Sequence, residues 1–462
     1  MKFKKQTSLF LAAVLTVAGL SGCAEKKETA NGEIEITISN WPDETNQKGV
    51  EAWDGYLNEF NEKFPNVKVN KDTTAFSDPK TFQVKAAANQ LSTLYLSYFT
   101  EIQSVIKQGY AADITDVLKE KGYMDALNPT LMELCKGPDG KYYAYPTSAY
   151  LRTMSINKDL YTQAGLVNED GTIKIPDTYE ELAEYSKIVK EKTGTAGFAI
   201  STTNNCGGWD FINIAWSFGV EFMKQRDDGT WEATFNTQEM RDALQYVKDL
   251  RWKYDCLPDE TVIDQATLHK LFAVGQAAVT FGGISQNYSS KYGMDPSIMV
   301  FAKMPEGRAG RYSQMGGGVA MFAPNSTNEQ INACLDFYEI TGIKPRVTEA
   351  DAKKIADSAA LTIESKGIVL PGKTLPLAND DESIRITKEA EAPYVNIPLE
   401  NCESALDLSN VIIKPEEPAC CQQLYAVLDG CIQEVLTNEN ADVAKLVETA
   451  CNDFQVNHLD KQ

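Results

Sequence analysis

The sequence predicts an α/β fold in which strands and helices alternate along the chain. Residues 34–39 (IEITIS) alternate apolar and polar side chains, as a half-buried strand does, and residues 50–64 then carry apolar side chains at helical spacing. The same succession returns at 93–99 and 103–110, where a short helix ends at a glycine. Strands separated by helices need crossover connections, which are typical of α/β layers.

The same alternation continues through the second half of the chain. Three pairs of residues are typical of helix N-termini: Thr178 with Glu181, Asn236 with Glu239, and Ser326 with Glu329. Four further apolar runs predict strands: 67–70, 197–201, 277–281 and 319–324. Residues 366–418 are rich in proline, and we expect them to wrap around the molecule as an extended segment.

Composition limits the class of partner. The chain has 462 residues, enough for two or three domains, and 43% of them are apolar. The formal net charge is -21, and residues 1–22 contribute three lysines and no acid to it. A chain this acidic repels nucleic acid and anionic membrane surfaces. Neutral or cationic ligands are therefore favoured.

The N-terminus predicts export and lipid attachment. Three lysines in the first five residues precede an apolar run at 9–20, which is shorter than a transmembrane helix. The string LSGC at 20–23 resembles the bacterial lipobox, so we expect a signal peptide at 1–22 and a lipid on Cys23. Residues 23–33 are polar and predict a flexible tether. This places the protein on the extracytoplasmic face of the cell membrane.

Nine cysteines remain once Cys23 is assigned to lipid. Several of them, such as Cys334 and Cys431, lie on apolar helical stripes, which favours small buried hydrophobic side chains over disulfides. Disulfides stay open as the alternative, because the protein is predicted to be exported. The adjacent Cys420 and Cys421 lack the spacing of a zinc site, and we expect no metal and no cofactor.

Catalytic motifs are missing from the sequence. The two histidines, His269 and His458, have no nucleophile motif nearby, and the chain has neither a GxSxG elbow nor an HExxH motif. A glycosidase needs only two carboxylates, and 65 acidic residues always supply two. A secreted carbohydrate-active enzyme therefore stays open as an alternative.

Aromatic residues follow several predicted strands. Trp41 comes after the first strand, Tyr98 ends the third, and Trp209 follows two glycines. In open α/β sheets, ligands bind beyond the carboxyl ends of strands. The apolar faces of sugar rings stack on aromatic rings, so these positions predict a carbohydrate site.

Several ordered motifs carry a resemblance to a known family. They include FNEKFPNVKVN at 60–70, GKYYAYPTSAYLRTMSINKDLYTQAGL at 140–166, LFAVGQAAVTFGG at 271–283, and KMPEGRAGRYSQMGGGVAMFAPNSTN at 303–328. In order and spacing the chain resembles the family 1 extracellular solute-binding proteins, the sugar-binding components of ATP-binding-cassette importers. The resemblance runs from about residue 34 to residue 342 and is weaker afterwards.

The resemblance implies a two-lobed fold of the type II periplasmic-binding-protein kind, with the ligand in a cleft between the lobes. The chain should cross between lobes near Pro146 and near 316–318. The N-terminal lobe is then 34–146 plus about 318–365, and the C-terminal lobe 147–316 plus about 366–462. The implied partners are a carbohydrate and the transmembrane permease subunits of an importer, with the protein itself a monomer.

Family position also implies a set of ligand-binding residues: Trp41, Asp43, Tyr98, Thr100, Tyr150, Arg152, Trp209, Asp210, Gly283 and Gln286. Many relatives place a tryptophan after the glycine at 283, whereas Ile284 and Ser285 stand here. Tyr288 or Tyr312 would then supply that rim of the site. Trp209 has an alternative role, because it could open a helix and pack inward with its neighbours.

These observations predict a lipid-anchored binding protein that captures a carbohydrate, in oligomeric form, and delivers it to an importer. Two alternatives stay open: a binder of a non-sugar solute in the same fold, and the secreted carbohydrate-active enzyme.

Overall fold

The computed structural model describes residues 32–75 and 79–461. The predicted signal peptide, the lipid attachment site at Cys23 and all but the last two residues of the tether lie outside the described residues. Within the described part of the chain, no helix combines the length and apolarity that a membrane span requires.

The elements alternate as the sequence predicts. The strands are β1 Ile34–Ile38, β2 Val67–Lys71, β3 Leu94–Tyr98, β4 Ala144–Leu151, β5 Met154–Asn157, β6 Ala196–Ala199, β7 Met223–Gln225, β8 Trp231–Ala233, β9 Ala277–Phe281, β10 Met299–Ala302, β11 Arg311–Phe322 and β12 Val411–Pro415. The first helices are α1 Gln47–Lys63, α2 Pro79–Ala87, the 3₁₀ turn η1 Phe99–Glu101, α3 Ile102–Lys107, α4 Thr115–Glu120, α5 Pro129–Leu134, α6 Lys158–Gln163, α7 Tyr179–Thr193 and α8 Cys206–Phe218. The later helices are α9 Gln238–Trp252, α10 Gln265–Ala273, α11 Asn287–Ser290, α12 Asn328–Thr341, α13 Ala352–Glu364, α14 Asp381–Glu391, α15 Glu403–Leu406, α16 Cys421–Thr437 and α17 Val443–Asn457.

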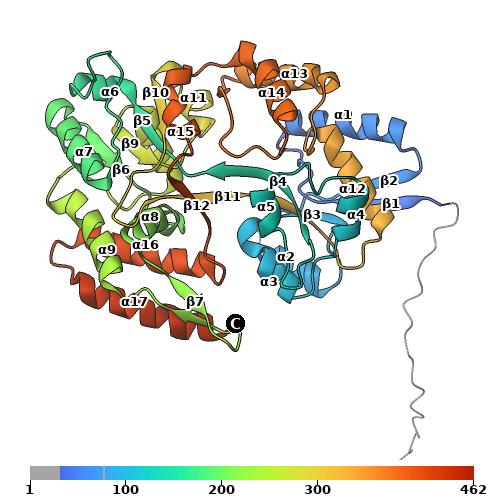
Figure 1. The fold of residues 1–462 in the computed structure, drawn as a ribbon, viewed down its shortest axis with the longest axis horizontal. Helices are drawn as coiled ribbons and strands as arrows, with labels where there is room; N and C mark the ends of the chain where they lie inside the picture. The colour runs from blue at the N-terminus through green and yellow to red at the C-terminus, as the bar shows by residue number, and fades with distance from the viewer. Residues whose placement is uncertain (1–31, 76–78, 462) are drawn as a thin grey trace, which may run out of the picture.

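Two sheets organise the molecule into two lobes (Figure 1). The first lobe holds a six-stranded sheet in which β2, β1 and β3 lie side by side, β3 and β12 pair with successive stretches of one edge of β11, and β4 pairs with the other edge of β11. The second lobe holds a four-stranded sheet in the order β10, β5, β9, β6. The chain passes from β4 directly into β5, so this strand pair connects the two sheets.

Each lobe has its own apolar core. In the first lobe, Ile36, Phe60 and Phe337 pack together with α4 and α12. In the second lobe, α7 packs on the small sheet, and α8, α9, α16 and α17 pack on one another around a core that includes Trp216. The red C-terminal helices lie beside the green helices α8 and α9 (Figure 1). Residues separated by about 200 positions therefore share one core.

Residues 366–408, which we call the strap, run between the lobes. The backbone of Ile368 exchanges two hydrogen bonds with the side chain of Gln286 in the second lobe, at 2.9 and 2.6 Å. Further along, the Asn128 N–H of the first lobe donates to the Leu377 carbonyl at 2.8 Å. The Asn401 side chain then donates to the Met299 carbonyl in the second lobe at 3.0 Å. The wrapping course predicted for 366–418 fits these contacts, but the segment is not extended throughout, because it contains α14 and α15.

The ends of some elements differ from those predicted. Thr327, not Ser326, begins α12, and Gln330 completes its capping box, because the Ser326 N–H already belongs to a turn that closes on Ala323. The strand predicted at 319–324 begins instead at Arg311. Three glycines at 316–318 interrupt its middle, and because glycine has low strand propensity they hid the first half of the strand in the sequence.

The cysteines follow the predicted hydrophobic role. All nine cysteines in the described residues are free thiols, and seven of them are buried. Burial raises the pKa of the Cys431 thiol to about 12, as expected of an inert apolar contact.

Candidate ligand-binding site between the lobes

Two strands meet end to end on β11 at the junction of the lobes. β3 runs antiparallel to β11 and ends with Tyr98 opposite Gly318. β12 runs parallel to β11 and ends with Pro415 opposite Met315. Their carboxyl ends therefore face one another across residues 316 and 317 of β11. Ligands of α/β proteins bind beyond such ends, so this gap is the candidate site.

Aromatic rings border this gap. Tyr98 is 47% exposed and Tyr150 is 41% exposed, so both rings are accessible to a ligand. Tyr150 lies opposite Gly316 on β11, and a Cβ atom at Gly316 would lie only 2.6 Å from its phenol ring. The glycine is therefore needed for the ring to lie across the strand. Thr100, in the turn after β3, is half-buried beside the same gap.

Trp209 extends this aromatic border from the second lobe. It lies in the first turn of α8, and its ring centroid is 6.5 Å from that of Tyr150 at an interplanar angle of 87°. The indole is half-buried and also packs against the second core. Its neighbours Phe211 and Ile214 are completely buried, whereas part of the indole stays exposed. Trp209 therefore has one side that packs inward and one side that is open.

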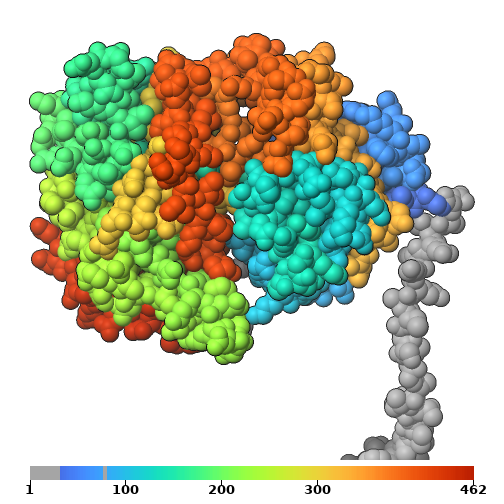
Figure 2. Space-filling view, viewed as in Figure 1, coloured from blue at the N-terminus to red at the C-terminus, as the bar shows by residue number. Residues whose placement is uncertain are grey.

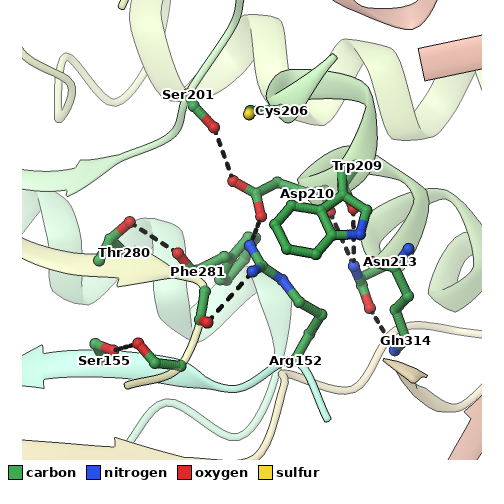
Figure 3. Close-up of polar contacts among 12 residues, drawn as sticks. Arg152, Ser155, Ser201, Cys206, Trp209, Asp210, Asn213, Thr280, Phe281 and Gln314 are labelled. Carbon is green, nitrogen blue, oxygen red and sulfur yellow. Dashed lines mark hydrogen bonds and ion pairs between the residues drawn. The ribbon is translucent and has the colours of Figure 1, made fainter. Parts of the chain in front are cut away.

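A buried ion pair holds the tryptophan in place (Figure 3). The Arg152 guanidinium lies 4.0 Å from the Trp209 ring centroid and forms a salt bridge with Asp210. It also donates to the Gly282 carbonyl at 3.3 Å, while Ser201 donates to the other Asp210 oxygen at 3.1 Å. Burial lowers the pKa of Arg152 below its ordinary value.

The prediction that Arg152 and Asp210 contact ligand directly does not fit this arrangement. Both side chains are only 2% exposed and their charges pair with one another. Their role in this structure is to position Trp209, because the guanidinium supports one face of the indole.

Two carboxylates that sequence reasoning missed also belong to the gap. Glu101 ends the turn after β3, and Glu416 follows the last residue of β12. Tyr425 donates to Glu416 at 2.8 Å, and Gln314 donates to the Tyr425 hydroxyl at 2.9 Å. Burial raises the pKa of Glu416 to about 7, with a further contribution from Glu101, and burial also raises the pKa of Glu101. No motif marks either position, and only the strand register brings them together.

Trp41 lies elsewhere, in the core of the first lobe. It is 4% exposed and its ring lies 4.9 Å from Trp53 and 5.7 Å from Phe337. Asn40 has a positive φ of 57°, and the Trp41 N–H donates to the Asp72 carbonyl at 2.9 Å. The turn after β1 thus points the indole inward, which favours packing over ligand contact.

Asp43 is exposed and closes the loop before α1. One of its oxygens accepts from the Thr45 N–H at 2.8 Å and from the Thr45 hydroxyl at 2.5 Å. These bonds lower the pKa of Asp43. The carboxylate is thus hydrogen-bonded within its own loop, and the structure does not bring it to the aromatic border.

Gly283 and Gln286 are structural residues after β9. Gly283 is buried, and its carbonyl accepts from Ser155 at 3.0 Å. Gln286 binds the strap backbone at Ile368, as described above. Tyr288 is completely buried, so it cannot provide a rim in place of the expected tryptophan. Tyr312 is half-buried against Trp216.

The two lobes are separated at the surface. Figure 2 shows a furrow between the cyan surface of the first lobe and the orange-red surface of the second. Three sequence-predicted residues, Tyr98, Tyr150 and Trp209, converge on the junction beneath the lobes, and their contact with a ligand stays a prediction.

Comparison with solved structures shows the same two-lobed architecture. A substrate-binding protein of Listeria monocytogenes, solved with cycloalternan, aligns with a TM-score of 0.66 at 19% identity, covering 92% of this chain and 98% of that one. The GacH receptor of Streptomyces glaucescens, solved with acarbose, aligns with a TM-score of 0.64 at 17% identity, covering 92% and 98%.

Sequence comparison gives relatives of the same kind, which align over a smaller share of the chain. A binding protein of Brucella abortus is 24% identical over 336 residues, which is 70% of this chain and 75% of the relative. The polygalacturonan/rhamnogalacturonan-binding protein of Bacillus subtilis is 25% identical over 280 residues, or 58% and 54%. The sequence model for bacterial extracellular solute-binding proteins matches residues 44–339, so this chain belongs to that family and is extracytoplasmic.

Proposed function

We propose that this protein is a lipid-anchored binding protein that captures an oligosaccharide and delivers it to an ATP-binding-cassette permease. The observation that carries the proposal is the aromatic border of Tyr98, Tyr150 and Trp209 where the carboxyl ends of two strands meet. Exposed rings beside hydrogen-bonding groups suit the mixed apolar and hydroxyl surface of a sugar. Relatives that bind polygalacturonan, and melibiose, raffinose and stachyose, support the ligand class.

Binding by lobe closure is part of the proposal. In this proposal the N-terminal lobe comprises 34–146 plus about 318–365 and the C-terminal lobe 147–316 plus about 366–462, with crossings near Pro146 and 316–318. Rigid lobes joined by a few strands rotate about the connecting residues. A ligand held between them favours the closed form.

The proposed role is binding without turnover. Glu101 and Glu416 lie at the gap, so a test for hydrolysis is still required. Incubation of purified protein with bound oligosaccharide, followed by chromatography, should recover the ligand intact. Shortened products would favour the enzyme instead.

A thermal-shift screen against oligosaccharides tests the function directly, because a ligand that binds only the folded state raises the melting temperature. Trp209→Ala should then weaken the affinity of a hit by at least about tenfold. Its apo stability should fall by less than the ~3–5 kcal/mol typical of a core aromatic, since the ring is half-buried.

Trp252→Ala is the matched control. This tryptophan is 39% exposed on α9, and its indole bonds to the Val435 carbonyl. Its removal should leave sugar affinity unchanged. Equal sugar affinity of Trp209→Ala and wild type would remove Trp209 from the site.

A further inference from the structure

The charges around the gap are unevenly distributed. Three cations lie on the elements that form the gap (β3, η1, β4, β11, β12, α8 and α16) or on the link after β4: Arg152, Arg311 and Lys414. Each is already paired. Arg152 binds Asp210, Arg311 binds Asp177 and Glu306, and Lys414 binds Glu417 at 3.1 Å.

The carboxylates at the gap are differently placed. Glu416 follows Pro415, which is opposite Met315, so it lies level with Gly316 and beside Tyr150. Glu101 enters from the other side, three residues after Tyr98. Glu416 accepts a hydrogen bond from the neutral Tyr425, and neither carboxylate has a salt bridge within the described residues. Once the pH exceeds the raised pKa of about 7 for Glu416, both side chains bring negative charge to the gap, and no salt bridge in the described part of the chain balances it.

The neutral groups nearby are hydrogen-bonding partners for hydroxyls. Gln314 is completely buried and acts indirectly: its amide donates to the Tyr425 hydroxyl, which in turn donates to Glu416. The tyrosines at 98 and 150 present rings and hydroxyls. A sugar hydroxyl can donate a hydrogen bond to a carboxylate. The carboxylate of an acidic sugar would instead lose its hydration beside groups of the same charge.

Resting on the proposed function, we infer that the site selects uncharged oligosaccharides and rejects uronic acids, with Glu101 and Glu416 as the residues that determine this specificity. A uronate would meet two carboxylates, one after the end of β3 and one after the end of β12, and no unpaired cation on the described elements that form the gap. Discrimination by such a repulsive element needs no additional contact to the favoured ligand.

The test uses matched sugars that differ only in charge. Maltotriose, cellotriose and galactotriose are compared with their forms oxidised at C6 to carboxylates, and with trigalacturonate, by calorimetry of the purified chain at about pH 8.5, above the raised pKa of Glu416. A wider set of neutral and acidic oligosaccharides is screened in parallel by native mass spectrometry. We expect the neutral member of a bound pair to bind at least about tenfold more tightly than its acidic form.

The variant Glu101→Gln/Glu416→Gln should reduce that ratio by about tenfold, because it removes both charges while keeping side-chain size. Glu403→Gln, an exposed change on α15, is the control and should leave the ratio unchanged. A uronate that binds as tightly as its neutral partner, or a ratio that the double variant leaves intact, overturns the inference while the binding function stands. Failure of every sugar, neutral and acidic, overturns the proposed function and this inference with it.

Discussion

Removing the carboxylate of Asp210 is expected to destabilise the second lobe strongly. Arg152 and Asp210 are each 2% exposed, so Asp210→Ala leaves a guanidinium charge buried against Trp209 without a counterion. Breaking a buried pair on one side typically costs about 3–5 kcal/mol. The hydrogen bond that Ser201 donates is lost as well, which adds about 1 kcal/mol.

The companion variant replaces both charges. Arg152→Met/Asp210→Leu keeps an apolar side chain against the indole and leaves no isolated charge, so it should be clearly more stable than Asp210→Ala. Urea unfolding of the ligand-free protein measures both variants. It should be followed by far-UV circular dichroism and by tryptophan fluorescence, because two lobes can unfold in separate transitions. A loss below about 1 kcal/mol for Asp210→Ala, or a double variant less stable than the single one, would refute this account of the ion pair.

Three further outcomes are expected. Cys23→Ser should release the protein from membranes into the medium, and a variant that fractionates with membranes like wild type would rule out the lipid anchor. Saturating sugar should reduce the radius of gyration in small-angle scattering, whereas an unchanged radius would count against lobe closure but not against binding. Glu416 has a pKa raised from 4.5 to about 7, so its stabilising contribution is complete below the lower value and is lost as the pH rises through the upper one. The free energy of unfolding should therefore fall by at most about 3 kcal/mol across this pH range. The melting temperature of ligand-free Glu416→Gln should depend less on pH than that of wild type. An equal pH dependence in the two proteins would show that Glu416 is not the titrating group.

Local patterns in the sequence predicted most elements, because the spacing of apolar residues and the residues that cap helices depend only on neighbouring positions. They predicted β1, β3 and β9 closely, and Trp209 and Tyr150 were both selected as site residues. They failed where the position of a side chain depends on how strands that are distant in the sequence pair with one another. Trp41 lies just after a strand and Tyr98 at the end of one, yet the backbone hydrogen bond from Trp41 to Asp72 turns Trp41 into the core. Glu416 had no sequence signal, since its place depends on β12 lying alongside β11.

The order of synthesis has a consequence for folding. The core of the second lobe takes its side chains from α8 and α9 and also from α16 and α17, which come about 200 residues later (Figure 1). The large sheet likewise joins β1 to β12 through β3 and β11. Contacts this distant in sequence form slowly, because long loops must close first. A nascent chain that has not yet delivered residues 411–457 exposes the apolar faces of both α8 and β11, so it remains a substrate for chaperones and proteases until those residues emerge.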